Sequence, residues 1–358
     1  MMFKIAVSGL GNVGRGLLRM WDQVAGWADA NGIKIALVAA LDSTGGLADV
    51  HGLDPKRVLR EKERYKKLAE SPASKKINAK YVIDAMKPDV FIDMTPTNVE
   101  SEAPGFRDVL HALRSGSNVV VSSKNHLRSI SAMEQVEALA NEGNLVFLDG
   151  ASVMGGTPVF EALGGLNADI KEARAILNGS TNYMLGRLES VDFDASLSDA
   201  IRLGYAEADY RYDTQGYDSA LKAVGLCNRI FGKKIEMSSI KMYGIDGKHL
   251  GIEGIAGAQV RMLKERGKTI KLVCTIRKTN GRISASVGPE ILDGNDPLAG
   301  VVGIDNAIEI KCMANMTEFR IFMAGPGSGG DVTASRVAGN LKIALEGMKR
   351  CRREKHKD

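Results

Sequence analysis

The sequence predicts an α/β protein with an N-terminal Rossmann-type parallel-sheet domain followed by a second domain of α+β type. Two observations carry this prediction. Up to about residue 149, short apolar, β-branched segments alternate with longer amphipathic segments, which is typical of a parallel sheet flanked by helices. After Gly150 the pattern changes to helical stretches followed by strands of alternating polarity.

The elements expected in the first domain follow from this alternation. We expect strands at 4–8, 33–41, 89–94, 118–122 and 145–148. Helices are expected to begin at Asn12 and to occupy 99–114 and 131–141. The heavily charged segment 55–67 is interpreted as a solvated helix.

The second domain is expected to contain strands at 268–279, 282–287 and 307–313. A glycine cluster at 325–330 precedes a last helix at 331–348, and residues 349–358 are expected to be frayed. We therefore divide the chain into residues 1–149, residues 150–324 and a segment 325–358 that returns to the first domain.

Composition limits the class of protein. A chain of 358 residues suits two domains, and its net charge of +5 is too mild to imply a nucleic-acid partner. The four cysteines are widely scattered and the five histidines lack metal-ligand spacing, so we expect a cytoplasmic protein without a transition metal. The N-terminus runs directly into a glycine loop, and no apolar stretch approaches about 18 residues, so neither a signal peptide nor a membrane span is expected.

A glycine-rich loop follows the first predicted strand and opens the first predicted helix. In Gly9-Leu10-Gly11-Asn12-Val13-Gly14, Gly9 permits a tight turn, Gly11 lets the backbone approach a pyrophosphate, and Gly14 lets helix and strand pack closely. The N–H groups at Asn12 and Val13 then face the phosphate charge. The loop predicts a dinucleotide-binding βαβ unit.

The far end of this unit leaves the choice of cofactor open. Asp42 ends the second strand, where an acidic residue would bind the adenosine ribose hydroxyls of NAD, although it lies 28 residues past Gly14. Lys56 and Arg57 could instead hold the 2′-phosphate of NADP. Asp42 could equally be a helix cap or a turn residue ahead of the following Ser-Thr-Gly-Gly.

Two further groups of polar residues are candidates for a site. Thr95 and Thr97 follow a strand at the edge where open α/β sheets bind ligands, although Thr97 or Asn98 could be an ordinary helix cap. Asp218 and Lys222 share one face of a predicted helix at i,i+4, which by itself could be a surface ion pair.

At this point the sequence closely resembles homoserine dehydrogenase. Seven blocks match that family in order over nearly the whole chain: Gly9–Gly14, Asp93–Asn98, Val120–Asn125, Ala151–Pro158, Leu177–Tyr183, Gly204–Asp209 and the Gly325 cluster. The resemblance implies interconversion of L-homoserine and L-aspartate 4-semialdehyde with NAD or NADP, on the route to threonine and methionine. The family is commonly dimeric and its second domain binds the substrate, and the alternating strands predicted for that domain would suit an intersubunit sheet, so we expect a homodimer.

Residue roles follow from the matched motifs. The resemblance makes Lys222 the proton donor and acceptor, places Lys124 beside nicotinamide and substrate, and puts Glu207, Asp213 and Asp218 in the substrate pocket. Gly327 in the late glycine cluster is assigned to the cofactor. A monovalent cation, usually sodium, is implied at the backbone carbonyls of Gly150, Val153, Gly155 and Thr157.

The residue types agree with the chemistry. Reduction of an aldehyde needs a hydride at carbon and a proton at the developing alkoxide, and a lysine serves both directions if burial or a second ammonium lowers its pKa. Lys124 and Lys222 could have that effect on each other, while Glu207 and Asp213 suit an α-ammonium. Tyr210 replaces a proline usual in the family, so a dehydrogenase of another small amino or hydroxy acid is the alternative, followed by a non-catalytic dinucleotide sensor. No appended regulatory ACT domain or aspartate kinase is expected.

Overall fold

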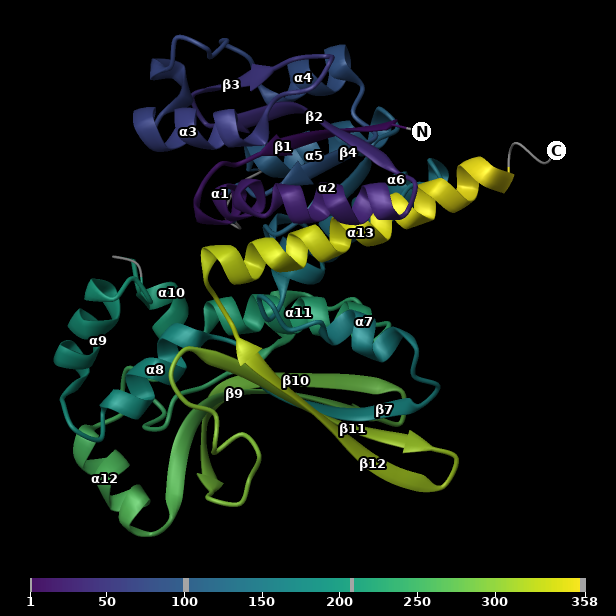
Figure 1. Ribbon diagram of the computed structural model, residues 1–358. Helices are drawn as coiled ribbons and strands as arrows, with labels where there is room; N and C mark the ends of the chain where they lie inside the picture. The colour runs from purple at the N-terminus through teal and green to yellow at the C-terminus, as the bar shows by residue number, and fades with distance from the viewer. Residues whose placement is uncertain (1, 99–102, 207–208, 355–358) are drawn as a thin grey trace. The chain divides into compact units, whose positions relative to one another are not determined.

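The structure is a computed structural model that describes residues 2–98, 103–206 and 209–354 (Figure 1). It divides into two compact units, one of Met1–Ser152 with Gly329–Asp358 and one of Val153–Ser328, which we call the N-terminal and central units. The central unit starts three residues after the second domain that the sequence predicts and ends four residues after it.

The N-terminal unit contains a six-stranded sheet in the order β3-β2-β1-β4-β5-β6. Its strands are β1 Met2–Ser8, β2 Lys34–Asp42, β3 Gly45–Ala48, β4 Val90–Asp93, β5 Asn118–Val121 and β6 Phe147–Leu148. All neighbouring strands are parallel except β3, which pairs antiparallel with β2. The predicted Rossmann-type sheet is confirmed, but β3 was not predicted, because it is a short, glycine-containing strand that pairs through a tight hairpin.

Helices cover both faces of this sheet (Figure 1). One face packs against α1 Asn12–Arg19, α2 Trp21–Ala30, α3 Pro55–Tyr65 and α13 Gly330–Glu354, and the other against α4 Ala79–Met86, α5 Pro104–Arg114 and α6 Ile130–Glu142. Central side chains such as Phe3, Ile5 and Phe91 are completely buried. Burial of each such side chain contributes about 1.5–3 kcal/mol of transfer free energy, which stabilises the sheet that carries the loops.

The last helix is longer than the sequence predicts. The tail expected to fray continues as helix to Glu354, and residues 355–358 lie outside the described residues. Arg352 of this segment pairs with Asp89 at 2.6 Å and lies 4.4 Å from the centre of the Phe3 ring. Lys349 donates a hydrogen bond to the carbonyl of Asn31. The expectation of fraying was wrong because these partners come from distant segments.

The central unit contains a second six-stranded sheet in the order β12-β11-β7-β9-β10-β8. Its strands are β7 Asp169–Ile176, β8 Lys241–Met242, β9 Lys268–Thr279, β10 Arg282–Asp293, β11 Asp305–Ala314 and β12 Thr317–Pro326. Neighbours are antiparallel except β8 and β10. β9 has its predicted bounds, β10 and β11 are longer than predicted, and β7 and β12 were not predicted.

Helices of the central unit are α7 Val159–Gly164, α8 Gly179–Arg187, α9 Phe193–Arg202, α10 Arg211–Thr214, α11 Tyr217–Phe231 and α12 Gly257–Glu265. α8 and α11 pack against the sheet (Figure 1). Short 3₁₀ turns occur at Leu68–Glu70, Asn125–Arg128, Gly150–Ser152 and Met237–Ser239.

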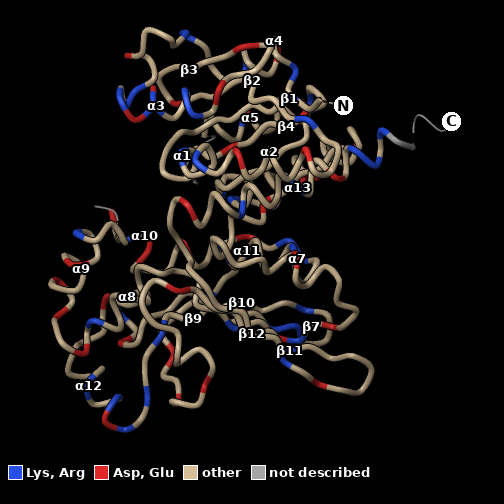
Figure 2. Tube along the Cα trace, in the orientation of Figure 1, with Lys and Arg blue, Asp and Glu red and all other residues tan. Residues whose placement is uncertain are grey.

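Charge is mixed along the chain. Figure 2 shows lysines and arginines interspersed with aspartates and glutamates in both units, including the charged helix α3. Across the part of the chain that the structure describes, no helix is both long enough and apolar enough to cross a membrane.

Candidate active site

The glycine loop between β1 and α1 has little room for side chains at two of its three glycines. Gly9 has a φ of +95°, and a Cβ atom there would lie 2.4 Å from the carbonyl group of Met94. A Cβ atom on Gly14 would lie 2.1 Å from the carbonyl oxygen of Gly9. Around Gly11, by contrast, no described atom lies within 4 Å of a Cβ position. Gly9 and Gly14 therefore serve the turn and the packing, while Gly11 leaves open space beside the backbone.

This open space adjoins the N-terminus of α1. Gly11 is the N-cap residue and offers no side-chain acceptor to the first N–H groups of the helix. Asn12 is exposed and accepts a hydrogen bond from Arg15 at 2.7 Å, and Val13 is half-buried against the core. Unsatisfied N–H groups at a helix start favour an anion, so the loop fits the pyrophosphate of a dinucleotide.

Asp42 lies at the end of β2, as predicted, but its carboxylate has several partners. One oxygen accepts from the amide and hydroxyl of Thr44 at 2.8 and 2.6 Å. The other accepts from Lys62 at 2.5 Å and from the amide of Leu68 at 2.9 Å. Burial alone would raise the pKa of Asp42, but these bonds lower it to about 2. The four accepting positions of a carboxylate are thus occupied, which is the turn role that the sequence left open.

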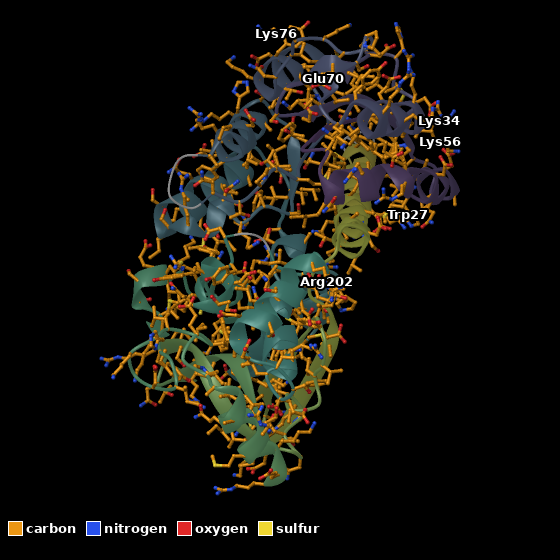
Figure 3. All side chains as sticks on the ribbon, turned by 90° about the vertical axis from the view of Figure 1, so that its left-hand side faces the viewer. Trp27, Lys34, Lys56, Glu70, Lys76 and Arg202 are labelled. Atoms are coloured by element: carbon orange, nitrogen blue, oxygen red, sulfur yellow. The ribbon has the colours of Figure 1, made fainter. Side chains whose placement is uncertain are left out.

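The base that reaches the end of β2 is Lys62, which the sequence did not single out. Just before α3, the amide of Leu53 donates to the carbonyl of Leu37 at 2.7 Å, so the chain enters α3 beside the middle of β2. The last turn of α3 then places Lys62 next to Asp42 at the end of β2. Lys56 lies about 9 Å earlier along the helix axis. It pairs with Asp22 at 2.7 Å and projects at the outer surface of the unit (Figure 3). Arg57 is also exposed.

The loops after β4 and β5 are joined by side-chain hydrogen bonds. Thr97 accepts from the amide of Lys124 at 3.0 Å, and the hydroxyl of Thr95 donates to Asp93 at 2.6 Å. Burial raises the pKa of Asp93. The cap interpretation of Thr97 and Asn98 is wrong, because α5 begins at Pro104 with Ala103 as its N-cap. Asn98 instead donates its amide to Asn125 at 2.8 Å.

A buried polar cluster in the central unit surrounds Lys222. On α11, the Lys222 ammonium lies 2.6 Å from Asp218 and donates to the carbonyl of Leu177 at 2.6 Å. Asn178, the N-cap of α8, donates to the same Asp218 oxygen at 3.0 Å. The Asp218 and Lys222 side chains are each only 10% exposed. The interpretation as a surface ion pair is therefore wrong, because Leu177 and Asn178, which connect β7 to α8, lie against the pair.

Asp213 of α10 joins this cluster. Burial and the nearby Asp218 charge raise the pKa of Asp213 to about 6, against the effect of Lys222 and of hydrogen bonds from Asn178 and Ser180. The ammonium of Lys222 is therefore flanked, within the central unit, by carboxylates. Glu207, predicted to share this pocket, lies outside the described residues, and Tyr210 immediately precedes α10.

The turn assigned to a cation has a left-handed backbone. Met154 and Gly155 have φ of +59° and +53°, and a Cβ atom on Gly155 would lie 2.7 Å from the carbonyl oxygen of Gly327. The carbonyl of Thr157 accepts from the amide of Val159 at 2.9 Å. Over the described ranges, no group of three or more His, Cys, Asp and Glu side chains is placed to hold a metal.

The structure thus groups the predicted residues by unit. Gly9 to Gly14, Asp42, Thr95, Thr97, Lys124 and Gly150 belong to the N-terminal unit, and Val153, Gly155, Thr157, Asp213, Asp218, Lys222 and Gly327 to the central unit. Sequence reasoning missed Lys62, the Leu177 carbonyl and the role of Asn178. Leu177 and Asn178 stand in a matched block, which was the available signal.

A glycine-cradled turn on a Rossmann sheet, with a buried lysine–carboxylate cluster in a second unit, defines a dinucleotide-dependent oxidoreductase. The family model for homoserine dehydrogenase matches residues 158–341. The chain belongs to the homoserine dehydrogenase family.

Similar proteins span nearly the whole chain. A homoserine dehydrogenase of Methanocaldococcus jannaschii is 29% identical over 94% of this chain and 97% of that protein. An NAD(+)-dependent homoserine dehydrogenase of Pseudomonas canavaninivorans is 30% identical over 95% of each chain. A hyperthermophilic archaeal homoserine dehydrogenase solved in complex with NADPH is 26% identical, with a TM-score of 0.79 over 97% of this chain and 98% of that chain.

Proposed function

We propose that this protein interconverts L-homoserine and L-aspartate 4-semialdehyde with NAD or NADP, in the biosynthesis of threonine and methionine. The observation that carries the proposal is the buried cluster of Lys222, Asp218 and Asp213 in a chain that is similar to homoserine dehydrogenases over nearly its full length. A buried ammonium beside carboxylates suits proton transfer at the substrate hydroxyl.

Lys222 is proposed to carry the proton. Its two acceptors among the described residues, Asp218 and the Leu177 carbonyl, use two of its three N–H bonds. The third donates to the oxygen of the aldehyde during reduction, and the neutral amine takes the hydroxyl proton during oxidation. Asp218 orients the ammonium and stabilises its charge. The nicotinamide supplies or accepts the hydride.

Asp213 is proposed to bind the α-ammonium of the substrate, together with Glu207. Asn178, a neutral donor, stabilises the Asp213 carboxylate without neutralising it, so the charge of Asp213 remains available to a cationic ligand. The raised pKa means that this charge is present only above about pH 6.

The N-terminal unit is proposed to bind the cofactor through Gly9 to Gly14, with Thr95, Thr97 and Lys124 toward the nicotinamide. The pyrophosphate fits beside Gly11, where a Cβ atom would meet no described atom. Both NAD and NADP are expected to work, because Lys62 neutralises the charge of Asp42, which would otherwise repel a 2′-phosphate.

A sodium ion at the carbonyls of Gly150, Val153, Gly155 and Thr157 remains a prediction from the family resemblance. In its support, the buried hydroxyl of Thr157 has no hydrogen-bond partner within the described residues. Activity that rises with NaCl but not with choline chloride at equal ionic strength would support the ion.

The direct test is homoserine-dependent reduction of NAD and of NADP at alkaline pH, with Lys222→Ala alongside. We expect turnover with at least one cofactor, and loss of turnover in the variant. If another small amino or hydroxy acid turns over far better than homoserine, the substrate assignment is wrong. Tight cofactor binding without turnover on any of them would indicate a sensor.

We also propose a homodimer formed through the sheet of the central unit. β12 is an edge strand of ten residues, and from Phe319 onward its half-buried residues lie on one face and its exposed residues on the other. Unpaired edges of this length invite pairing with another chain. Sedimentation showing only monomer at assay concentration would contradict this. The four cysteines are free thiols, which favours the cytoplasm.

A further inference from the structure

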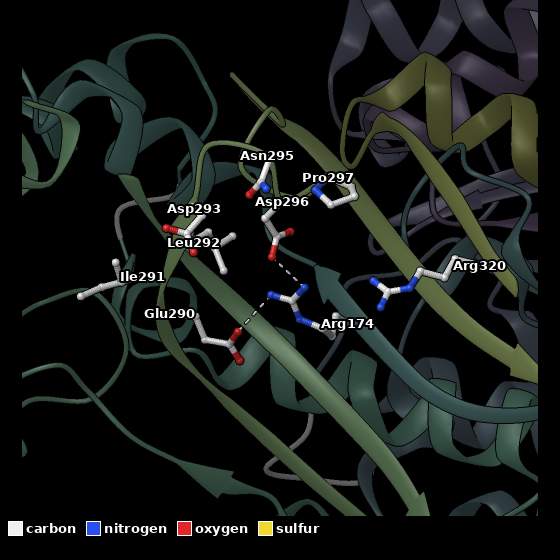
Figure 4. A pocket seen from close by; sticks show the side chains of 9 residues that line it. All are labelled: Arg174, Glu290, Ile291, Leu292, Asp293, Asn295, Asp296, Pro297 and Arg320. Atoms are coloured by element: carbon white, nitrogen blue, oxygen red, sulfur yellow. Dashed lines mark hydrogen bonds and ion pairs between the residues drawn. The ribbon is translucent and has the colours of Figure 1, made fainter. Parts of the chain in front are cut away.

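The connection between β10 and β11, residues 294–304, is tied to the central sheet by charged side chains. Arg174 of β7 donates to Asp296 at 2.9 Å and pairs with Glu290 at 3.3 Å, in the pocket drawn in Figure 4. Asp296 also accepts from the amide of Leu298 at 2.9 Å. The first half of the connection is therefore held by an ion-pair network.

The second half is held by a lysine inside the unit. Lys271 of β9 is 4% exposed, and its acceptors are neutral: the carbonyl of Val301 at 2.6 Å and the side-chain oxygen of Asn182 at 2.9 Å. No carboxylate of the described residues bonds to it, and burial lowers the pKa of Lys271 to about 8. Burying an ammonium costs free energy, whereas a methionine of similar length would pack at this position without that cost. We therefore look for the contribution of Lys271 in the two groups that it binds, the Val301 carbonyl and Asn182.

Asn182 extends this hold along the connection. Its amide group donates to the carbonyls of Gly303 and Asp305 at 3.1 and 3.2 Å. A Cβ atom on Gly179, at the start of the same helix α8, would lie 2.3 Å from the carbonyl oxygen of Ile304. The end of the connection therefore lies directly against α8.

Just after the connection, in β11, Asn306 shares a hydrogen-bond acceptor with Lys222. Asn306 is completely buried at the start of β11 and donates to the carbonyl of Leu177 at 3.1 Å. The same carbonyl accepts from Lys222 at 2.6 Å. A shift of residues 301–306 would therefore move an acceptor that orients the Lys222 ammonium.

We propose that Lys271 is a positioning residue for the reaction: it holds Val301 and Asn182, and through Asn306 and the Leu177 carbonyl it fixes the direction of the Lys222 ammonium. This rests on the proposed function, in which Lys222 carries the proton. Lys271 itself does not touch the substrate.

The test compares Lys271→Met with Ile270→Ala. Ile270 is the adjacent buried residue of β9, on the opposite face of the strand, so its truncation lowers stability without removing a hydrogen bond to the connection. For Lys271→Met we expect kcat with homoserine to fall about tenfold, since a misplacement of about 1 Å costs up to a hundredfold. The KM for the cofactor should stay unchanged, and amide hydrogen exchange at 303–307 should be faster than in the unaltered protein. Ile270→Ala should keep kcat within about twofold.

Asn182→Ala provides a second variant, which serves also if Lys271→Met does not fold. It removes the shared partner, so we expect the same loss of kcat, and the double variant should lose less than the product of the two effects. If both single variants keep kcat and exchange rates at the level of Ile270→Ala, the positioning role is wrong. Absence of homoserine turnover in the unaltered protein would overturn the proposed function as well.

Discussion

The glycine loop of the N-terminal unit and the Lys222 cluster of the central unit are built in opposite ways. The loop is six consecutive residues, Gly9 to Gly14, whose contribution is backbone shape and free N–H groups. The Lys222 cluster draws polar groups from β7 to β11, between Leu177 and Asn306 in the sequence, and buries charges beside them.

This difference separates two kinds of sensitivity. A loop that depends on close backbone approach is damaged by one added carbon atom, while a cluster of buried charges is damaged when one partner is lost and another is left unpaired. Substitutions in the two regions should therefore differ in their effects.

The largest effect is expected for Lys222→Met. Loss of a general acid–base group lowers kcat by about 10²–10⁴-fold. Affinity for NADPH, measured by fluorescence titration, should be unchanged, because the dinucleotide loop belongs to the other unit. Lys268→Met, which removes an exposed lysine paired with Asp293 at 2.9 Å, is the matched control and should keep full activity.

Gly11→Ala and Gly14→Ala should separate binding from folding within the loop. The Cβ atom that Gly11→Ala adds meets no described atom, so the melting temperature of this variant should stay near that of the unaltered protein. The same atom occupies the space proposed for the pyrophosphate, so the cofactor should bind at least about tenfold more weakly. Gly14→Ala would place a carbon 2.1 Å from a carbonyl oxygen and should lower the melting temperature clearly. Equal melting temperatures for the two variants would contradict the assigned roles.

Asp213 should give the proposed substrate pocket a pH dependence. Its pKa is raised to about 6, so the carboxylate is neutral below that pH and no longer attracts an α-ammonium. We expect kcat/KM for homoserine to fall about tenfold per unit below pH 6, and Asp213→Asn to lack this limb. Because the folded pKa lies above the unfolded one, ionisation of Asp213 costs stability between about pH 4 and 6. Denaturant unfolding should therefore show that the free energy of unfolding of Asp213→Asn increases relative to that of the unaltered protein as the pH rises through that range.

The smallest effect is expected at the end of β2. Lys62→Met leaves the Asp42 carboxylate without its cation, which should cost about 2 kcal/mol of unfolding free energy, less than for a fully buried pair because Lys62 is 14% exposed. The uncovered charge should also raise KM for NADP several-fold relative to NAD. The double variant Asp42→Asn with Lys62→Met should restore the ratio of KM for NADP to KM for NAD. If that ratio does not change in Lys62→Met, the 2′-phosphate binds elsewhere.

Features that depend on local backbone were readable in the sequence. The Rossmann-type parallel sheet, the bounds of β9 and the start of α1 at Asn12 follow from periodicity and from glycines that a turn requires. The matched blocks also predicted the homoserine dehydrogenase family correctly, because they contain the chemically important residues in the order that the family has.

Tertiary structure alone decided which side chains pair across distant segments. It paired Asp42 with Lys62 and the amide of Leu68, and it placed the Leu177 carbonyl beside Lys222. It also extended α13 through the ion pair of Arg352 with Asp89. The glycine loop and the α11 pair were visible in sequence because spacing sets their geometry. The partners of a buried charge are visible only in the fold, because residues far apart in the chain supply them.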